Sequence, residues 1–154
     1  ISVVPSLNPD VSIIHAQRAD ENGDVQVWGI IGDHREAAFA SKKVIVSVEE
    51  VVDDYVIRSD PNKTLVPDFI VDALVEDPWA AHPSYAQGYY DRDNEFYIEW
   101  DKISMEIDTL EKYLEEWVYG VENRVKYLKK LGAEKLMKLK PRSFYSVTAN
   151  YGRY

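Results

Sequence analysis

The sequence predicts an α/β fold: a largely parallel central sheet with flanking helices, followed by a helical C-terminal extension. Two β-branched runs, residues 11–15 and 43–51, enclose a short alanine-rich segment, and strand, helix, strand is the order of a parallel α/β layer. From residue 96 onward, apolar side chains recur at spacings of three and four, the period of an α-helix. We expect an α/β domain over residues 1–90, a helical extension packed on it over 91–140, and an aromatic tail over 141–154.

The first strand is expected at Val11–His15, because this β-branched run follows the turn-like sequence Asn8-Pro9-Asp10. A second run, Val25–Trp28, predicts the next strand. Between them, Asn22-Gly23 offers the positive φ angles that a tight reversal needs. The two strands are therefore predicted to be connected as a pair.

Gly29 and Gly32 lead into Asp33, whose side chain is a good N-cap, so a short helix is predicted over His34–Ala40. The next segment, Lys43–Val51, is almost uniformly β-branched in its first half. That pattern is typical of a parallel strand covered on both faces.

The polar segment Asp53–Lys63 contains Pro61 and is predicted to be a loop, and Pro67–Val75 is predicted to be a helical turn or a strand. The C-terminal apolar stripe is expected to be helical core rather than a cofactor site. Its members are Phe96, Trp100, Ile103, Ile107, Leu110, Leu114 and Trp117.

Charge and composition exclude several function classes. The formal net charge is −9 and the pI about 4.8, which disfavours nucleic acid and anionic membranes as partners. A basic run over residues 126–142 is the local exception and indicates a solvated helix face or a surface that meets an acidic partner subunit or an anionic cofactor. No signal peptide and no apolar run of about 20 residues is present, so we expect a cytoplasmic protein.

The chain contains no cysteine, which excludes a disulfide framework and a thiolate nucleophile within these residues. Its three histidines, His15, His34 and His82, are far apart and lack the spacing of metal ligands, so no metal site is expected. Carboxylates are the better candidates, because Glu49 and Glu50 follow a hydrophobic strand and open α/β sheets carry functional residues at strand ends.

Several linked motifs resemble one family. Ala19-Asp20-x-x-Gly23-Asp24 is similar to the Ala-Asp-x-x-Gly-Asn turn of the α-type subunit of family I CoA-transferases, with Asp24 departing from the family's Asn. Residues 48–53 (VEEVVD) resemble the Val-Glu-Glu-Ile-Val segment that follows the next strand in that family. VDALV at 71–75, AAHPS at 80–84 and YYDRD at 89–93 resemble the branch that contains glutaconate CoA-transferase α subunits. The resemblance runs from about residue 5 to residue 132.

The resemblance implies that this chain corresponds to the C-terminal half of such a subunit. The N-terminal half, which carries the first part of the sheet, would have been removed or would lie on another polypeptide. In the family, the nucleophile that attacks an acyl-CoA thioester is a glutamate of the β-type subunit, and a glutamyl-CoA intermediate follows. CoA would then be a substrate, exchanged between an acyl-CoA and a small carboxylic acid, with no permanently bound cofactor, metal or nicotinamide. The chain alone is expected to be inactive.

Glu21-Asn22-Gly23 superficially repeats the surroundings of the family's nucleophile, but its flanking residues place it in the α-type frame, so Glu21 is not our expected nucleophile. Seven residues are candidates for a substrate or CoA site, since they lie at strand ends or turns within matched motifs: His15, Asp20, Gly32, Asp33, Glu49, Glu50 and His82. Two other functions stay open: part of a ring-cleaving hydrolase of CoA thioesters with the same fold, and a noncatalytic assembly domain.

Overall fold

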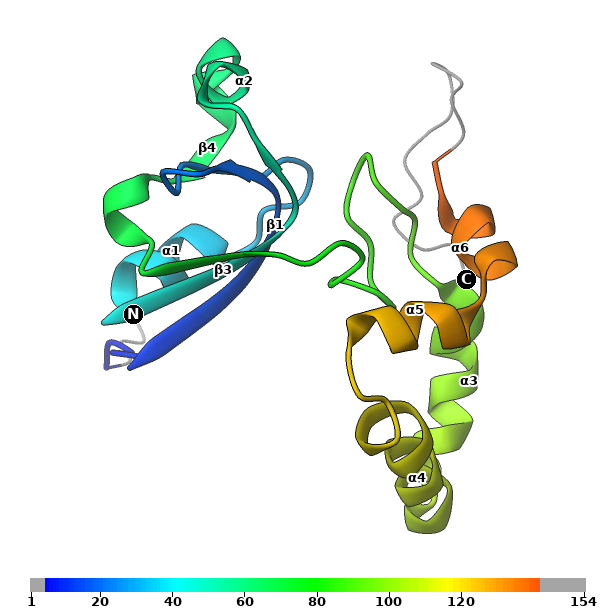
Figure 1. Cartoon of the computed structure of the whole chain (residues 1–154). Coiled ribbons are helices and arrows are strands. Elements are labelled where there is room, and N and C mark those ends of the chain that lie inside the picture. Colours follow the sequence, from blue (N-terminus) through cyan, green and yellow to red (C-terminus); the bar gives the residue numbers. More distant parts are fainter. Residues whose placement is uncertain (1–4, 142–154) are drawn as a thin grey trace. The chain divides into compact units, whose positions relative to one another are not determined.

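The computed structural model describes residues 5–141 and divides into two compact units, residues 1–80 and 81–154 (Figure 1). The predicted α/β class is confirmed: the first unit holds a five-stranded sheet and the second is helical. The division falls after Ala80 rather than after Tyr90, so the loop that begins at Ala81 belongs to the helical unit. The aromatic tail, apart from Pro141, lies outside the described residues.

The sheet has the order β4-β2-β1-β3-β5. Its strands are β1 (Val11–Asp20), β2 (Val25–Gln26), β3 (Lys43–Val52), β4 (Thr64–Val66) and β5 (Ala73–Glu76). β1, β3 and β5 are parallel, whereas β2 is antiparallel to both β1 and β4. The predicted strand pair is present, although β1 extends further than expected, to Asp20.

One face of the parallel strands carries the hydrophobic core. Ile14 and Ala16 of β1 pack with Val44, Val46 and Val48 of β3, and all five are buried. The helix α1 (His34–Ala40) lies against this face and contributes its buried Ala38 (Figure 1). The alternate residues of β3 are only half-buried or exposed until Glu49. The expectation that this strand is covered on both faces is therefore wrong for the described residues.

The segment predicted as a loop contains a helix, α2 (Asp54–Ser59), followed by the 3-10 turn η1 (Pro61–Lys63). A side-chain pair between Asp54 and Arg58, one helical turn apart, and the burial of Ile57 favour this helix. The next segment contains both predicted alternatives, a 3-10 turn η2 (Asp68–Ile70) and then β5. The predicted helix α1 is correct, but the Asp33 side chain makes no capping hydrogen bond.

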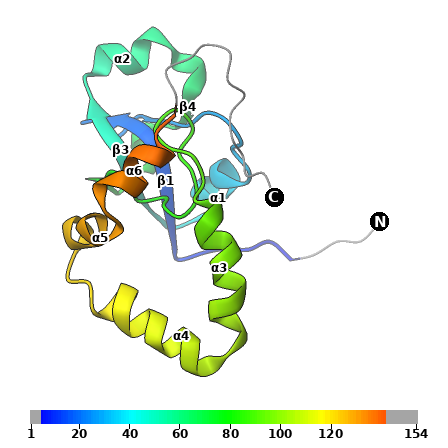
Figure 2. The same ribbon diagram turned by 90° about the vertical axis from the view of Figure 1, so that its right-hand side faces the viewer.

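The second unit contains α3 (Asn94–Met105), α4 (Ile107–Leu114), a π-helical turn η3 (Glu115–Tyr119), α5 (Arg124–Leu131) and α6 (Ala133–Leu139). Figure 2 shows α3 and α4 following one another around a bend, where Glu106 is extended. The predicted apolar stripe is helical, but none of these helices contains a buried residue and Ile107 is 72% exposed. Between residues 5 and 141, no helix is long and apolar enough to span a membrane.

Candidate functional site

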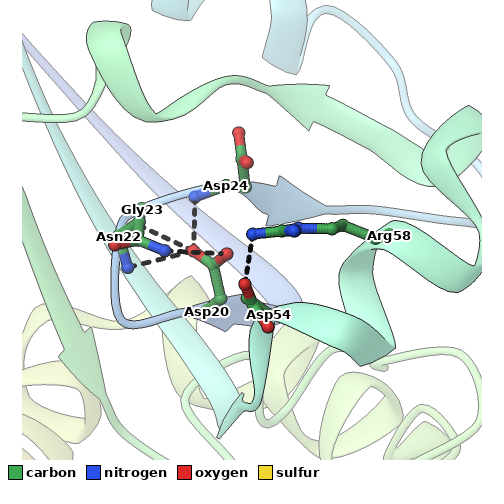
Figure 3. Close-up of polar contacts among 6 residues, drawn as sticks. All are labelled: Asp20, Asn22, Gly23, Asp24, Asp54 and Arg58. Atoms are coloured by element: carbon green, nitrogen blue, oxygen red, sulfur yellow. Dashed lines mark hydrogen bonds and ion pairs between the residues drawn. The ribbon is translucent and has the colours of Figure 1, made fainter.

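The Asp20 carboxylate builds the turn that follows β1 (Figure 3). Its Oδ1 accepts hydrogen bonds from the backbone N–H groups of Asn22 at 3.0 Å, Gly23 at 2.9 Å and Asp24 at 3.0 Å. Gly23 has a φ of +107°, a conformation that favours glycine. Asp24 in turn accepts the N–H of Asp68 at 3.1 Å, which ties the turn to η2. Asp20 is buried and its carboxylate serves the backbone of this turn.

A hollow of about 440 Å³ lies at the carboxyl ends of β1 and β3, where open α/β sheets commonly bind ligands. It is lined by Asp20, Glu21, Asn22, Val51, Val52, Asp53, Asp54 and Tyr55. Glu21 is exposed on this hollow, and Asp54 is paired with Arg58 (Figure 3). Because carboxyl groups dominate the lining, its field disfavours an anionic ligand such as a phosphate or a carboxylate.

His15 and Glu49, both predicted as site residues, are brought together on neighbouring strands. His15 Nε2 lies 2.6 Å from Glu49 Oε1, and His15 Nδ1 lies 2.8 Å from Ser47 Oγ. With Glu49 ionised, Nε2 must carry a hydrogen and donate a hydrogen bond, since a carboxylate only accepts hydrogen bonds. A neutral His15 then accepts a hydrogen bond at Nδ1 from the Ser47 hydroxyl group. The arrangement fixes the tautomer and the orientation of the ring.

The second oxygen of Glu49 holds a strained turn. Its Oε2 accepts the backbone N–H of Trp79 at 2.7 Å, and Trp79 has a φ of +69°, a value uncommon for a residue other than glycine. The Glu49 side chain is 3% exposed, against 19% for His15. Glu49 therefore links β1, β3 and the turn after β5 from a buried position.

In the helical unit, His82 is the centre of a buried polar chain. His82 Nδ1 lies 2.7 Å from the Tyr127 hydroxyl, and Nε2 lies 3.2 Å from Asp93 Oδ2. The same Asp93 oxygen pairs with Lys135 Nζ at 2.7 Å, while its other oxygen accepts the N–H of Phe96 and so caps α3. Together these contacts join the 81–93 loop to α3, α5 and α6.

Burial sets the protonation of this chain. Desolvation lowers the pKa of His82, although the hydrogen bond to Asp93 opposes that shift. Burial opposes ionisation of Asp93, but the Lys135 ammonium and the Phe96 N–H outweigh it, so the pKa of Asp93 is lowered. Burial, with Tyr113 nearby, raises the pKa of Tyr127 to about 12. The chain therefore contains a neutral imidazole, an ionised Asp93 and a protonated phenol at neutral pH.

The polar chain opens onto a cavity of about 130 Å³ with aromatic walls. The rings of Tyr113 and Trp117 are stacked with centroids 6.4 Å apart, and Trp117 meets Tyr127 edge-on at 6.0 Å. The other lining residues are His82, Phe96, Glu99, Ile103, Leu131 and Lys135. The cavity lies within the helical unit, and its rings explain part of the predicted stripe.

The remaining candidates lie apart from the His15 cluster. Glu50 projects from β3 to the side opposite Glu49, because successive side chains alternate along a strand. Gly32, with a φ of +60°, and Asp33 lie in the exposed segment before α1. His82 belongs to the helical unit. Among residues 5–141, no three His, Asp or Glu side chains are arranged to hold a metal ion.

Sequence reasoning missed Ser47, Trp79, Asp93, Tyr127 and Lys135. The period-2 spacing of Ser47 and Glu49 placed them on one face of a strand, but only the register places His15 beside them. Asp93 stands three residues before Phe96 at the start of the helical stripe, which is a capping signal that could have been used. The contacts of Tyr127 and Lys135 carry no sequence signal of their own.

Comparison with known proteins shows which family the chain belongs to. The family described as Coenzyme A transferase matches residues 3–77, which are nearly all of the first unit. The A subunit of the 3-oxoadipate CoA-transferase of Pseudomonas knackmussii is 42% identical over 135 residues, covering 88% of this chain and 47% of that protein. The chain belongs to the coenzyme A transferase family. The resemblance stated from the turn and strand-end motifs is thereby confirmed.

Other relatives extend the match through the helical unit. The A subunit of the glutaconate CoA-transferase of Acidaminococcus fermentans is 41% identical over 140 residues, or 91% of this chain and 44% of that protein. The crystal structure of that enzyme superimposes with a TM-score of 0.86 over the same shares. The cholesterol ring-cleaving hydrolase IpdA subunit of Rhodococcus jostii is 27% identical over 124 residues, covering 78% of this chain and 42% of that protein. The chain thus spans a little less than half the length of these relatives.

Proposed function

We propose that this chain is part of the A-type subunit of a CoA-transferase, which moves CoA between an acyl-CoA and a small carboxylic acid. The observation that carries the proposal is the agreement in fold and sequence with glutaconate CoA-transferase, a TM-score of 0.86 at 41% identity that spans both units. The relative from Pseudomonas knackmussii, also a CoA-transferase by name, supports the same reaction class.

The reaction that we propose proceeds through a glutamate of a B-type partner subunit. That carboxylate attacks the thioester carbonyl and the C–S bond breaks. CoA departs as the thiolate, and an acyl-glutamyl anhydride is formed. The thiolate then attacks the glutamyl carbonyl, which releases the first acid and forms a glutamyl-CoA thioester. The second acid then reacts by the same steps in reverse. Its carboxylate attacks the glutamyl-CoA thioester and displaces CoA thiolate, which attacks the new acyl carbonyl, so that the new acyl-CoA departs and the glutamate is restored. CoA enters as a substrate, and we propose no permanently bound cofactor.

The local chemistry of this chain supports a nucleophile on the partner. Glu21 faces a hollow that it shares with Asp20, Asp53 and Asp54, and Arg58 is paired with Asp54. A carboxylate in this field would have to approach a CoA thioester whose phosphates are also negative. A partner subunit that brings cationic groups to this edge would complete a site that favours anions.

Two other functions differ from this proposal in measurable ways. A ring-cleaving hydrolase subunit, supported by the 27% identity to the Rhodococcus protein, would consume a CoA thioester without an acceptor acid. A noncatalytic assembly domain would bind its partner without turnover.

The test is to purify the full subunit that contains this chain together with its B-type partner, and to follow acyl-CoA consumption with and without acceptor acids such as acetate. Transfer predicts acyl-CoA exchange only when the acid is present, and native mass spectrometry should show a stoichiometric complex. Consumption without acid would favour the hydrolase, and a stable complex with no turnover on any acyl-CoA would favour the assembly domain.

A further inference from the structure

The second face of the parallel strands carries exposed apolar side chains. In-register pairs across β1, β3 and β5 place these side chains in rows on one face: Val11 with Lys43, Ile13 with Ile45 and Ala73, and His15 with Ser47 and Val75. Ile13, on the central strand of the sheet, is 76% exposed, and Val75 is 52% exposed. Parallel sheets are normally covered on both faces, so an exposed isoleucine in mid-sheet is unusual.

In the first unit, the turn at Trp79 meets this face at Glu49, but Ile13 and Val75 stay exposed. The parallel strands β1, β3 and β5 follow one another in the same direction across the sheet. Because crossovers between parallel strands are right-handed, two crossovers made in the same direction lie on the same face of the sheet. The first crossover contributes Ala38 of α1 to the core. The second packs Leu65, Ile70 and Val71 against the same core. Both crossovers of the described unit therefore cover the face that carries Ile14 and Ala16.

We propose that this open face, the rows headed by Val11, Ile13 and His15, is the docking surface for an apolar helix from the portion of the same subunit outside these 154 residues. The proposal rests on the part of the proposed function that places the chain in a longer subunit. The relatives are more than twice as long as their match to this chain, with 47% and 44% covered, so ample chain exists to supply the helix. A helix is the element that covers parallel strands.

The polar cluster lies within this docking surface. His15 and Ser47 form the third row, beside the exposed Val75. The buried Glu49 carboxylate contacts His15 Nε2. A docked helix would bury the part of His15 that is still exposed and remove the hydrogen bond between His15 and Glu49 from water. Such a buried polar pair tolerates few alternative packings, so it would fix the register of the helix on this face.

Thiol labelling tests the proposal, because the 154 residues contain no cysteine. Ile13→Cys is compared with the matched control Ile30→Cys, a residue of similar exposure (65%) outside the sheet. Each variant is made in the longer subunit, purified without its partner, and its maleimide reaction is followed by peptide mass. We expect position 13 to react at least about 100-fold more slowly than position 30.

The same variants are labelled in the 154-residue chain, where position 13 should react about as fast as position 30. Equal rates in the longer subunit would overturn the proposal. Protection that appears only after the B-type partner is added would overturn it in favour of the partner, and protection already present in the 154-residue chain would overturn it in favour of the helical unit or a second copy. Transfer activity, measured after the B-type partner is added to the same preparations, separates a failure of this inference from a failure of the proposed function.

Discussion

Glu49 Oε1 lies 2.6 Å from His15 Nε2 across two neighbouring parallel strands, and the Glu49 side chain is only 3% exposed. The carboxylate is satisfied on both sides, because its other oxygen accepts the N–H of Trp79. Removing one member of such a buried pair leaves the other with an unmet charge or hydrogen bond, which costs more than the pair contributes. Glu49 is therefore a structural centre of the sheet as well as a predicted site residue.

Glu49→Gln should destabilise the protein by about 2 kcal/mol. The amide replaces a charged acceptor and places its NH₂ group against another donor, either the Trp79 backbone N–H or His15 Nε2–H. Urea unfolding measures this change. The matched control Glu36→Gln, on the exposed surface of α1, should stay within about 0.5 kcal/mol of wild type. A Glu49 variant as stable as the control would contradict the structural role.

Asp20→Ala should cost about 2–3 kcal/mol, since three backbone N–H groups, one of them on the buried Gly23, lose their acceptor. Asp20→Asn keeps one carbonyl oxygen and should lose less than half of that. Urea midpoints of the two variants give the comparison. If Asp20→Ala abolished CoA transfer while unfolding like the wild type, Asp20 would act on substrate rather than on the turn.

The helical unit should lose stability as the pH falls below about 6.5, the ordinary pKa of histidine. Burial lowers the pKa of His82 in the folded state, so the unfolded chain binds a proton first and folding is penalised by at most about 1.4 kcal/mol per pH unit. The loss continues down to the folded pKa. Asp93, whose pKa is also lowered, adds its own loss only near and below its ordinary value of 3.8.

Hydrogen exchange of residues 81–139 between about pH 7.5 and 5.5, corrected for the intrinsic pH dependence of exchange, measures this loss. His82→Asn should flatten the profile in that range. A helical unit that is equally protected at both ends of the range, or better protected at the acidic end, would contradict the assignment of His82 as a neutral buried group.

Tyr127→Phe should cost about 1–2 kcal/mol, because it leaves Nδ1 of the buried His82 without the hydroxyl that lies 2.7 Å away. Tyr119→Phe is the matched control, since Tyr119 is 78% exposed, and should be nearly neutral. Thermal unfolding of both variants is the measurement. A loss shared equally by the two would mean that the hydroxyl of Tyr127 contributes nothing specific.

Local patterns in the sequence were sufficient for much of the fold. Asn22-Gly23 marked the turn after β1, and the β-branched run from Lys43 marked β3, because both signals are carried by consecutive residues. The helix α2 was missed because a nearby proline, Pro61, suggested a loop, whereas the proline follows the helix and starts the next turn.

The candidate site was predictable only in part. His15 and Glu49 were selected separately for their strand positions, but their contact depends on the pairing of His15 with Ser47 across two strands, 32 residues apart. The role of Asp20 was hidden for the opposite reason: a carboxylate in a motif suggests chemistry, and only the three short bonds to its own turn show what occupies it. Long-range register is not written in any one segment.

In the function proposed above, this chain supports CoA transfer while a glutamate of the partner carries the intermediate. The direct measurement is to incubate the complete enzyme with acyl-CoA, reduce the trapped thioester with borohydride, and locate the modified glutamate by peptide mass spectrometry. We predict that the modified glutamate lies in the B-type partner and that the peptide around Glu21 stays unmodified. Modification of Glu21 itself, with the partner untouched, would contradict the account.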